Sequence, residues 1–124
     1  MGAEAFIGRC AKALPGAELG EALFSDGVAL WAGQREIAHA HGEGTVEIRL
    51  TKDGIRARRV ELRADGRVKL RKNASDWLEF DIVDERDETD AFELVRTAIT
   101  LNALTAKPGP PSTGADLARR RRFH

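Results

Sequence analysis

The sequence contains little of what marks secreted, metal-cluster or membrane proteins. Cys10 is the only cysteine, so neither an internal disulfide nor a cysteine-based zinc cluster can form. No apolar run approaches the ~20 residues that a membrane-spanning helix needs. The first residues lack a basic segment followed by an apolar stretch, so no signal peptide is visible. We therefore expect a cytoplasmic protein with no membrane partner.

The chain also lacks a net charge, since 20 basic residues balance 20 acidic ones. This balance argues against a nucleic-acid partner, because such domains usually carry excess positive charge. The charges are unevenly placed, however. From Arg49 to Lys72 there are ten basic and three acidic residues, whereas from Asp76 to Glu93 there are nine acidic residues and one arginine. Either two oppositely charged segments lie side by side, or the basic segment recognises an anionic ligand or protein.

The remaining composition is typical of one globular domain. The chain has 124 residues, of which 42% are hydrophobic and 32% charged, which is enough for one core and too short for two. We place a single domain at residues 1–106. The proline-rich stretch 107–111 ends it, and residues 107–124, which include the run Arg119–Arg122, are predicted to form a flexible tail.

Hydrophobic periodicity predicts an α+β fold. Helical spacing of apolar residues favours helices over 4–14 and 87–104, and residues 19–24 form a weakly patterned link or a short strand. Alternation favours strands over the ranges 28–32, 36–41, 45–50 and 77–83.

Residues 52–64 fit two alternatives. Their composition favours a helix, followed by a strand at 67–71, whereas a hairpin would set Val60 opposite Leu70. We predict the helix. The fold is then an antiparallel sheet of about five strands with an N-terminal, a middle and a C-terminal helix packed on one face.

The strands 36–41 and 45–50 carry the strongest candidate site. Residues two apart in a strand point to one face, so His39 and His41 project together. A turn over 42–44 places His39 opposite Glu47, about 5 Å away between Cβ atoms, with Arg49 further along the same face. The alternate positions of both strands are apolar and form the predicted core side.

Two histidines and a carboxylate on one face permit several chemistries. They can act as acid and base without a metal. His39, His41 and Glu47 can also bind a single Fe, Mn or Zn ion. The third interpretation is a solvent-facing strand whose polar residues happen to include two histidines.

Four segments form a longer pattern. They are Leu14–Gly16, Arg35–His41, Val46–Thr51 and Ser75–Phe80. Together they resemble the luciferase-domain family, which comprises fungal luciferases and small bacterial proteins of unknown role. The resemblance spans about residues 14–101 and centres on a strand with the pattern Gly-x-Arg-Glu-apolar-Ala-His-x-His. Gly42 departs from it, because relatives often have proline after the second histidine.

The resemblance implies oxygenation of a hydroxylated pyrone without a cofactor, as in the fungal members. A histidine would remove the proton of an acidic enol, and the resulting carbanion would react with O₂. The implied catalytic residues are His39 as the base, His41 as its partner and Arg49 as the group that holds the anion, with Arg35 as the alternative to Arg49.

Three further residues are ligand-binding candidates, namely Arg35, Glu47 and Trp77. Arg35 and Glu36 can instead form an ion pair at the start of a strand, and a lone tryptophan at a strand start usually packs on the core. These residues therefore have structural interpretations as well.

Three functions follow as hypotheses, and the sequence does not decide whether the protein is an enzyme. The first is a cofactor-independent oxidase or oxygenase of a small, acidic, enol-type molecule. The second is a non-catalytic module that binds an anionic ligand or a protein partner. The third is a mononuclear metal-binding domain that uses His39, His41 and Glu47.

Overall fold

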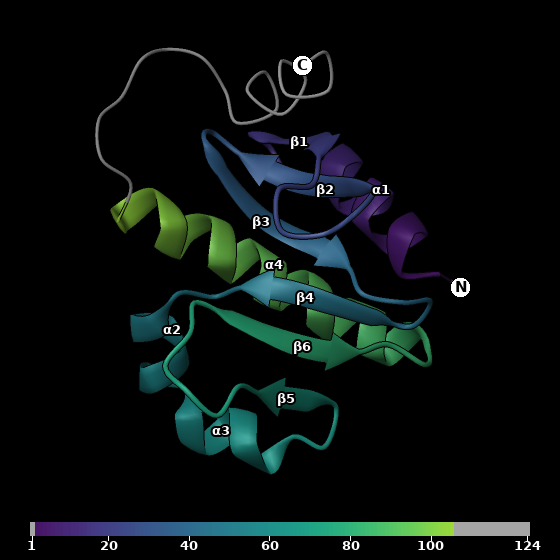
Figure 1. Cartoon of the computed structure of the whole chain (residues 1–124). Helices are drawn as coiled ribbons and strands as arrows, with labels where there is room; N and C mark the ends of the chain where they lie inside the picture. The colour runs from purple at the N-terminus through teal and green to yellow at the C-terminus, as the bar shows by residue number, and fades with distance from the viewer. Residues whose placement is uncertain (1, 106–124) are drawn as a thin grey trace.

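The computed structural model of the chain describes residues 2–105, which form a six-stranded sheet and four helices (Figure 1). The elements in chain order are α1 (Ala3–Ala13), β1 (Ala17–Glu21), β2 (Val28–Ala32), β3 (Arg35–Ala40), β4 (Thr45–Arg49), α2 (Lys52–Ala57), α3 (Arg59–Ala64), β5 (Val68–Leu70), β6 (Trp77–Asp81) and α4 (Glu85–Thr105). The predicted tail at 107–124, with its run Arg119–Arg122, lies outside the described residues.

All neighbouring strands pair antiparallel, in the order β1-β2-β3-β4-β6-β5. The predicted α+β class and antiparallel sheet are confirmed, with six strands where about five were expected. The additional strand is β1, which overlaps the weakly patterned segment 19–24, where a short strand was one of the two expectations. It pairs with β2 from Ala17 opposite Ala32 to Glu21 opposite Val28. Because this pairing uses backbone groups, it requires little regularity from the side chains.

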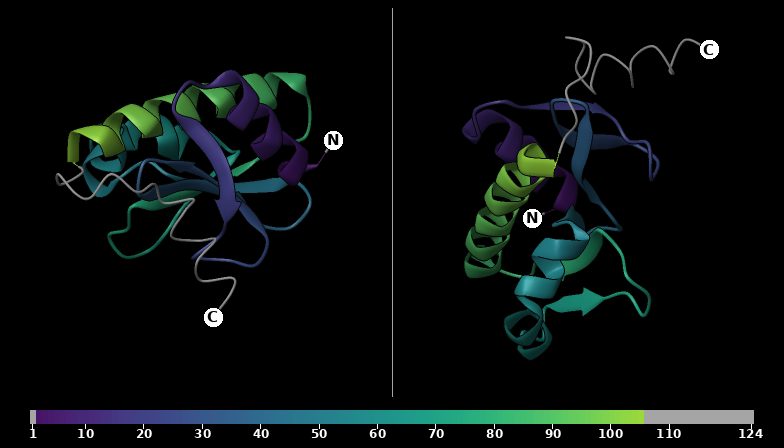
Figure 2. Two further views of the ribbon diagram at one scale, coloured as in Figure 1. Left: turned by 90° about the horizontal axis from the view of Figure 1, so that it is seen from above. Right: turned by 90° about the vertical axis from the view of Figure 1, so that its left-hand side faces the viewer.

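Helices α1 and α4 cover one face of the sheet (Figure 2). The core between them and the sheet includes Phe6 and Ile7 of α1, Val95 of α4, and Leu78 and Phe80 of β6, all of them almost fully buried. The alternation of the 77–83 segment predicted this core face correctly. Among residues 2–105, no helix is long and apolar enough to cross a membrane.

The ambiguous middle segment is helical, as predicted, although it forms two short helices. The chain changes direction at Arg58, which has φ −113° and ψ 14° and lies between α2 and α3. Ile55 and Leu62 are buried and belong to the main core. The alternative hairpin is excluded because Leu70 pairs with Leu78 of β6, while Val60 is 84% exposed.

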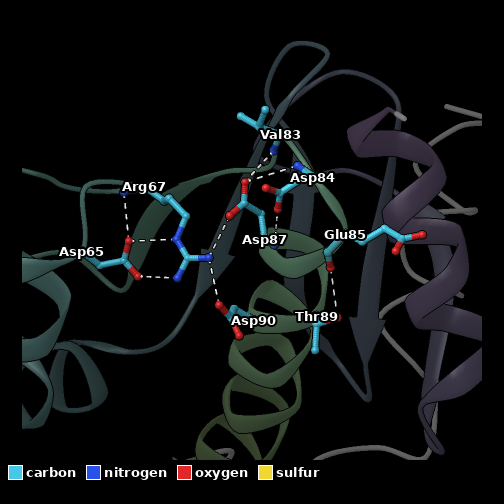
Figure 3. A network of polar contacts seen from close by, with 8 residues as sticks. All are labelled: Asp65, Arg67, Val83, Asp84, Glu85, Asp87, Thr89 and Asp90. Atoms are coloured by element: carbon cyan, nitrogen blue, oxygen red, sulfur yellow. Dashed lines mark hydrogen bonds and ion pairs between the residues drawn. The ribbon is translucent and has the colours of Figure 1, made fainter.

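Arg67 joins the basic segment to the acidic segment at the start of α4 (Figure 3). Its guanidinium donates to both carboxylate oxygens of Asp65, at 2.9 and 2.8 Å, and to one oxygen each of Asp87 and Asp90, at 2.9 Å. These hydrogen bonds hold the pKa of the Asp65 and Asp87 carboxyls below the usual value. At this point the two oppositely charged segments do lie side by side, and the residues leading into β5 are tied to the helix.

Gly54 of α2 lies close to a side chain of α4 and yields a stability prediction. A Cβ at this position would lie 2.7 Å from Cδ1 of Leu101 and 3.3 Å from Cγ of the buried Leu50. We expect Gly54→Ala to lower the free energy of unfolding by about 1–3 kcal/mol through overpacking, as measured by urea denaturation. Gly8→Ala is the matched control, since this glycine of α1 has open space around it. The control should gain about 0.5–1 kcal/mol, and equal loss in both variants would contradict the packing argument.

Candidate functional site

The hairpin of β3 and β4 has the predicted register. His39 lies opposite Glu47, and Glu47 lies opposite Glu79 of β6, so three titratable residues form one row across the sheet. The His41 amide donates to the Thr45 carbonyl at 2.7 Å and closes the hairpin. This row lies on the face opposite the one that α1 and α4 cover, since the alternate residue Val46 belongs to the main core.

An irregularity in β3 adds Glu36 to this face. Leu30 of β2 pairs with Ala38, but the next residue, Trp31, pairs with Glu36, so that Ile37 is an extra residue in β3. Ile37 and Ala38 both belong to the main core. Such a bulge reverses the alternation that follows it. Glu36 and His39 therefore share a face, with Oε1 of Glu36 3.7 Å from Nδ1 of His39.

His39 is enclosed on this face rather than open to solvent. Its side chain is 2% exposed, and its ring lies 5.0 Å from the Trp77 ring between centroids. Nε2 of His39 is 3.4 Å from Oε1 of Glu47, and neither ring nitrogen has a well-aligned hydrogen bond within the described residues. Burial lowers the pKa of His39, because the charged imidazolium would lose its hydration.

Glu36 is buried beside His39, under the loop that connects β1 to β2. Figure 1 shows this loop crossing in front of the sheet, and the Leu23 amide in it donates to Oε1 of Glu36 at 3.2 Å. Burial raises the pKa of Glu36 to about 7, although the hydrogen bond from Leu23 acts in the opposite direction. The neutral carboxyl and the neutral imidazole are thus the forms that this interior favours.

His41 is the solvent-accessible member of the cluster. Its side chain is 61% exposed, with Nδ1 3.1 Å from Oε1 of Glu47 and Nε2 3.7 Å from Oε1 of Glu79. The same Glu47 oxygen therefore lies near both histidines. Glu36, His39, Glu47 and His41 form a continuous row of alternating acidic and basic groups from the interior to the surface, which we call the acid–base row.

Arg49, the residue predicted to hold the anion, lies beside the aromatic side chains near His39. The Arg49 guanidinium lies 5.8 Å from the ring centroids of both Phe24 and Trp77 and 3.7 Å from Asp76. It contacts the aromatic cover of His39, and the guanidinium that bonds Glu47 is instead that of Arg71. The sequence did not single out Arg71. Its pattern predicts the strands around Arg71 but not which strands they pair with in the sheet.

The remaining ligand-binding candidates are divided between the two faces. Trp77 covers His39 and is itself largely buried, so its structural interpretation is at least part of its role. Arg35 pairs with Ala32, which packs against the main core. Its position thus belongs to the helix-covered face, apart from the acid–base row. Phe24, another residue that the sequence did not single out, packs against Trp77 at 5.5 Å between ring centroids.

The metal-binding hypothesis gains no support from this arrangement. Oε1 of Glu47 lies between the two histidines, but His39 and His41 approach this oxygen rather than a common open position. Among residues 2–105, no group of three or more His, Cys, Asp or Glu side chains is arranged to hold a metal ion. A carboxylate oxygen between two imidazoles is an arrangement that suits acid–base chemistry.

The raised pKa of Glu36 predicts a dependence of stability on pH. A carboxyl with a higher pKa in the folded state than its ordinary value of 4.5 binds its proton more tightly when folded. Its stabilising contribution is therefore complete below pH 4.5 and is lost as the pH rises through about 7. Relative to Glu36→Gln, the wild-type protein should lose on the order of 1–3 kcal/mol of unfolding free energy across this window.

Urea denaturation at a series of pH values measures this difference. The lowered pKa of His39 acts in the opposite direction, but it is present in both proteins and largely cancels. Glu43→Gln, a change at an exposed position of the nearby turn, should differ from wild type by a constant amount. Parallel stability curves for wild type and Glu36→Gln would refute the assignment of a buried, protonated Glu36.

Comparisons with known proteins agree with the resemblance carried by the two histidine-bearing strands. The family model described as the luciferase domain matches residues 34–98, which is just over half of the chain and includes β3, β4, β6 and the acid–base row. No curated protein matches the chain, and no solved structure does so. The length of the family match and the histidine pattern within it show that the chain belongs to the luciferase-domain family.

Proposed function

We propose that this luciferase-domain protein performs general acid–base chemistry on a small, acidic, enol-type molecule, as a cofactor-independent oxidase or oxygenase. The observation that carries the proposal is the position of Oε1 of Glu47, 3.4 Å from Nε2 of His39 and 3.1 Å from Nδ1 of His41. A carboxylate at these distances orients an imidazole and stabilises its protonated form. Family membership supports the choice of reaction class, although a fold alone does not establish an activity.

Accessibility favours His41 as the group that contacts substrate. Its side chain is largely exposed, whereas that of His39 is 2% exposed beneath Trp77. The sequence-based hypothesis had His39 as the base and His41 as its partner, and we now propose the reverse arrangement. His39 and Glu36 are then positioning residues, which act on His41 through Glu47.

The proposed reaction needs only the substrate, O₂ and the acid–base row. His41 accepts the proton of the enol hydroxyl, and Glu47 stabilises the resulting imidazolium. The enolate transfers an electron to O₂, and its carbon then forms a bond to the reduced oxygen. The resulting peroxide takes back the proton from His41. The product is a hydroperoxide that contains all atoms of the enol and of O₂.

The location that we propose for this function is the cytoplasm, with which the single cysteine accords.

Oxygen uptake tests the proposal. The purified protein is mixed with a panel of hydroxylated pyrones, and O₂ consumption is followed with an electrode across a range of pH. We expect consumption above the rate in buffer and a loss of about 100-fold or more in His41→Gln, because a general base typically contributes this much. His39→Gln should instead shift the pH profile, since it acts through Glu47.

Glu43→Gln is the control, because it changes an exposed side chain two residues from His41. It should keep the wild-type rate and pH profile. The absence of any uptake above buffer across the panel would overturn the proposed reaction class. Wild-type activity in His41→Gln would overturn the role of His41 while leaving the reaction class intact.

A further inference from the structure

A pocket is lined by residues of α2, α3, β5 and the loop from β5 to β6. Figure 1 shows these elements in the lower part of the molecule. The pocket has a volume of about 290 Å³. Its basic lining residues are Lys52, Arg56, Arg59, Arg63, Arg71 and Lys72, and no acidic residue lines it. We call this site the basic pocket.

Most of the positive charge in the basic pocket is uncompensated. Arg56 lies 3.7 Å from Asp53, and Arg71 bonds Glu47. The other four cations make no ion pair within the described part of the chain. Like charges that converge on one concavity repel each other and concentrate anions there. The arrangement therefore favours a negatively charged occupant.

The positions of the arginines follow from local structure. Arg59 and Arg63 are four residues apart in α3, so they project from the same face of the helix. The neighbouring Arg58 does not line the pocket, because its guanidinium donates to the Gly54 carbonyl at 3.3 Å. Six of the ten basic residues in this segment therefore line the pocket, whereas Arg58 and Arg67 bond other parts of the chain.

The size and remaining lining of the pocket narrow the class of ligand. Its volume is near the lower end of the range for small-molecule sites, about 300–1,000 Å³. Ile55, Leu70 and Trp77 supply an apolar part, and Asn73 and Ser75 supply neutral polar groups. Guanidinium groups pair with planar or tetrahedral oxyanions through two hydrogen bonds at once. We propose that the basic pocket binds a small organic molecule that carries two or more oxyanion groups, either phosphate or carboxylate.

This proposal is independent of the oxygenase proposal, although two residues connect the sites. Trp77 lines the basic pocket and also lies against His39. Arg71 lines the pocket and also bonds Oε2 of Glu47. The pocket therefore adjoins the acid–base row, but its affinity for anions requires no activity of His41.

A nucleic acid or a membrane is a weaker fit to the same charges. Single-stranded nucleic acids usually occupy an extended basic groove with several stacking aromatics, whereas this pocket is compact and Trp77 is the only aromatic residue that lines it. A membrane surface binds through a basic patch that projects toward it, often beside exposed apolar side chains. The concave shape favours a ligand that enters between the arginines.

Calorimetric titration with pyrophosphate and with citrate tests the proposal. At low ionic strength we expect saturable binding of at least one of them, with an affinity that falls as salt is added. The variant carrying both Arg59→Ala and Arg63→Ala should bind at least about tenfold more weakly, because hydrogen bonds to charged groups are typically worth 1.5–3 kcal/mol. The stronger of the two probes identifies the oxyanion as phosphate or carboxylate.

The matched control carries Lys12→Ala and Arg86→Ala, which remove the same charge at exposed positions outside the pocket. It should keep the wild-type affinity for both probes. Urea denaturation checks that both double variants fold with near-normal stability, as expected for changes at solvent-facing side chains.

Several results would overturn the proposal. One is the absence of saturable binding of either probe, and another is an equal loss of affinity in the two double variants. A single-stranded RNA oligonucleotide that binds through Arg59 and Arg63 but is not displaced by pyrophosphate would indicate a nucleic-acid site instead. Co-sedimentation with phosphatidylserine vesicles, lost in the Arg59→Ala and Arg63→Ala variant and without binding of either probe, would indicate a membrane surface instead.

Discussion

The extra residue in β3 is the constraint on which the candidate site depends. With Ile37 inserted opposite the step from Leu30 to Trp31, both Ile37 and Ala38 enter the core and Glu36 turns to the face of His39. Regular alternation would place Glu36 on the core face, where a carboxyl has no acceptable surroundings. The bulge thus lets one strand place apolar side chains in the core and a carboxyl on the opposite face. This carboxyl lies beside the buried His39.

The sheet separates stability from chemistry between its two faces. The helix-covered face holds almost the whole apolar core, which keeps the strands in register. The other face carries the acid–base row, whose inner members Glu36 and His39 are covered by the β1–β2 loop and by Trp77. Electrostatic interactions strengthen when water is excluded, so Glu36 and His39 influence each other and Glu47 more than exposed residues would. Exposed His41 brings this influence to the surface.

Charge segregation along the chain has two separate consequences in space. Arg67 satisfies the acidic start of α4 through Asp87 and Asp90 and so fixes the position of β5. Six other cations of the same segment have few acidic partners and converge on the basic pocket. The sequence allowed two interpretations of the basic segment. Pairing with the acidic segment holds for Arg67, and recognition of an anion still applies to the pocket residues. Both arise because α2, α3 and β5 fold back on the edge of the sheet.

The sequence by itself determined the elements and the local geometry of the hairpin. Alternation and a short turn are properties of neighbouring residues, so they sufficed to place His39 opposite Glu47 and to identify the core face of β6. They left open whether the segment that contains β1 is a strand. They did not reveal the break at Arg58, the side of the sheet that Glu36 occupies, or the partnership of Arg71 with Glu47. Only the tertiary structure decided these features. The side occupied by Glu36 depends on a one-residue shift of register, and the bond of Arg71 to Glu47 joins residues distant in the chain. Neither leaves a periodic trace in the sequence.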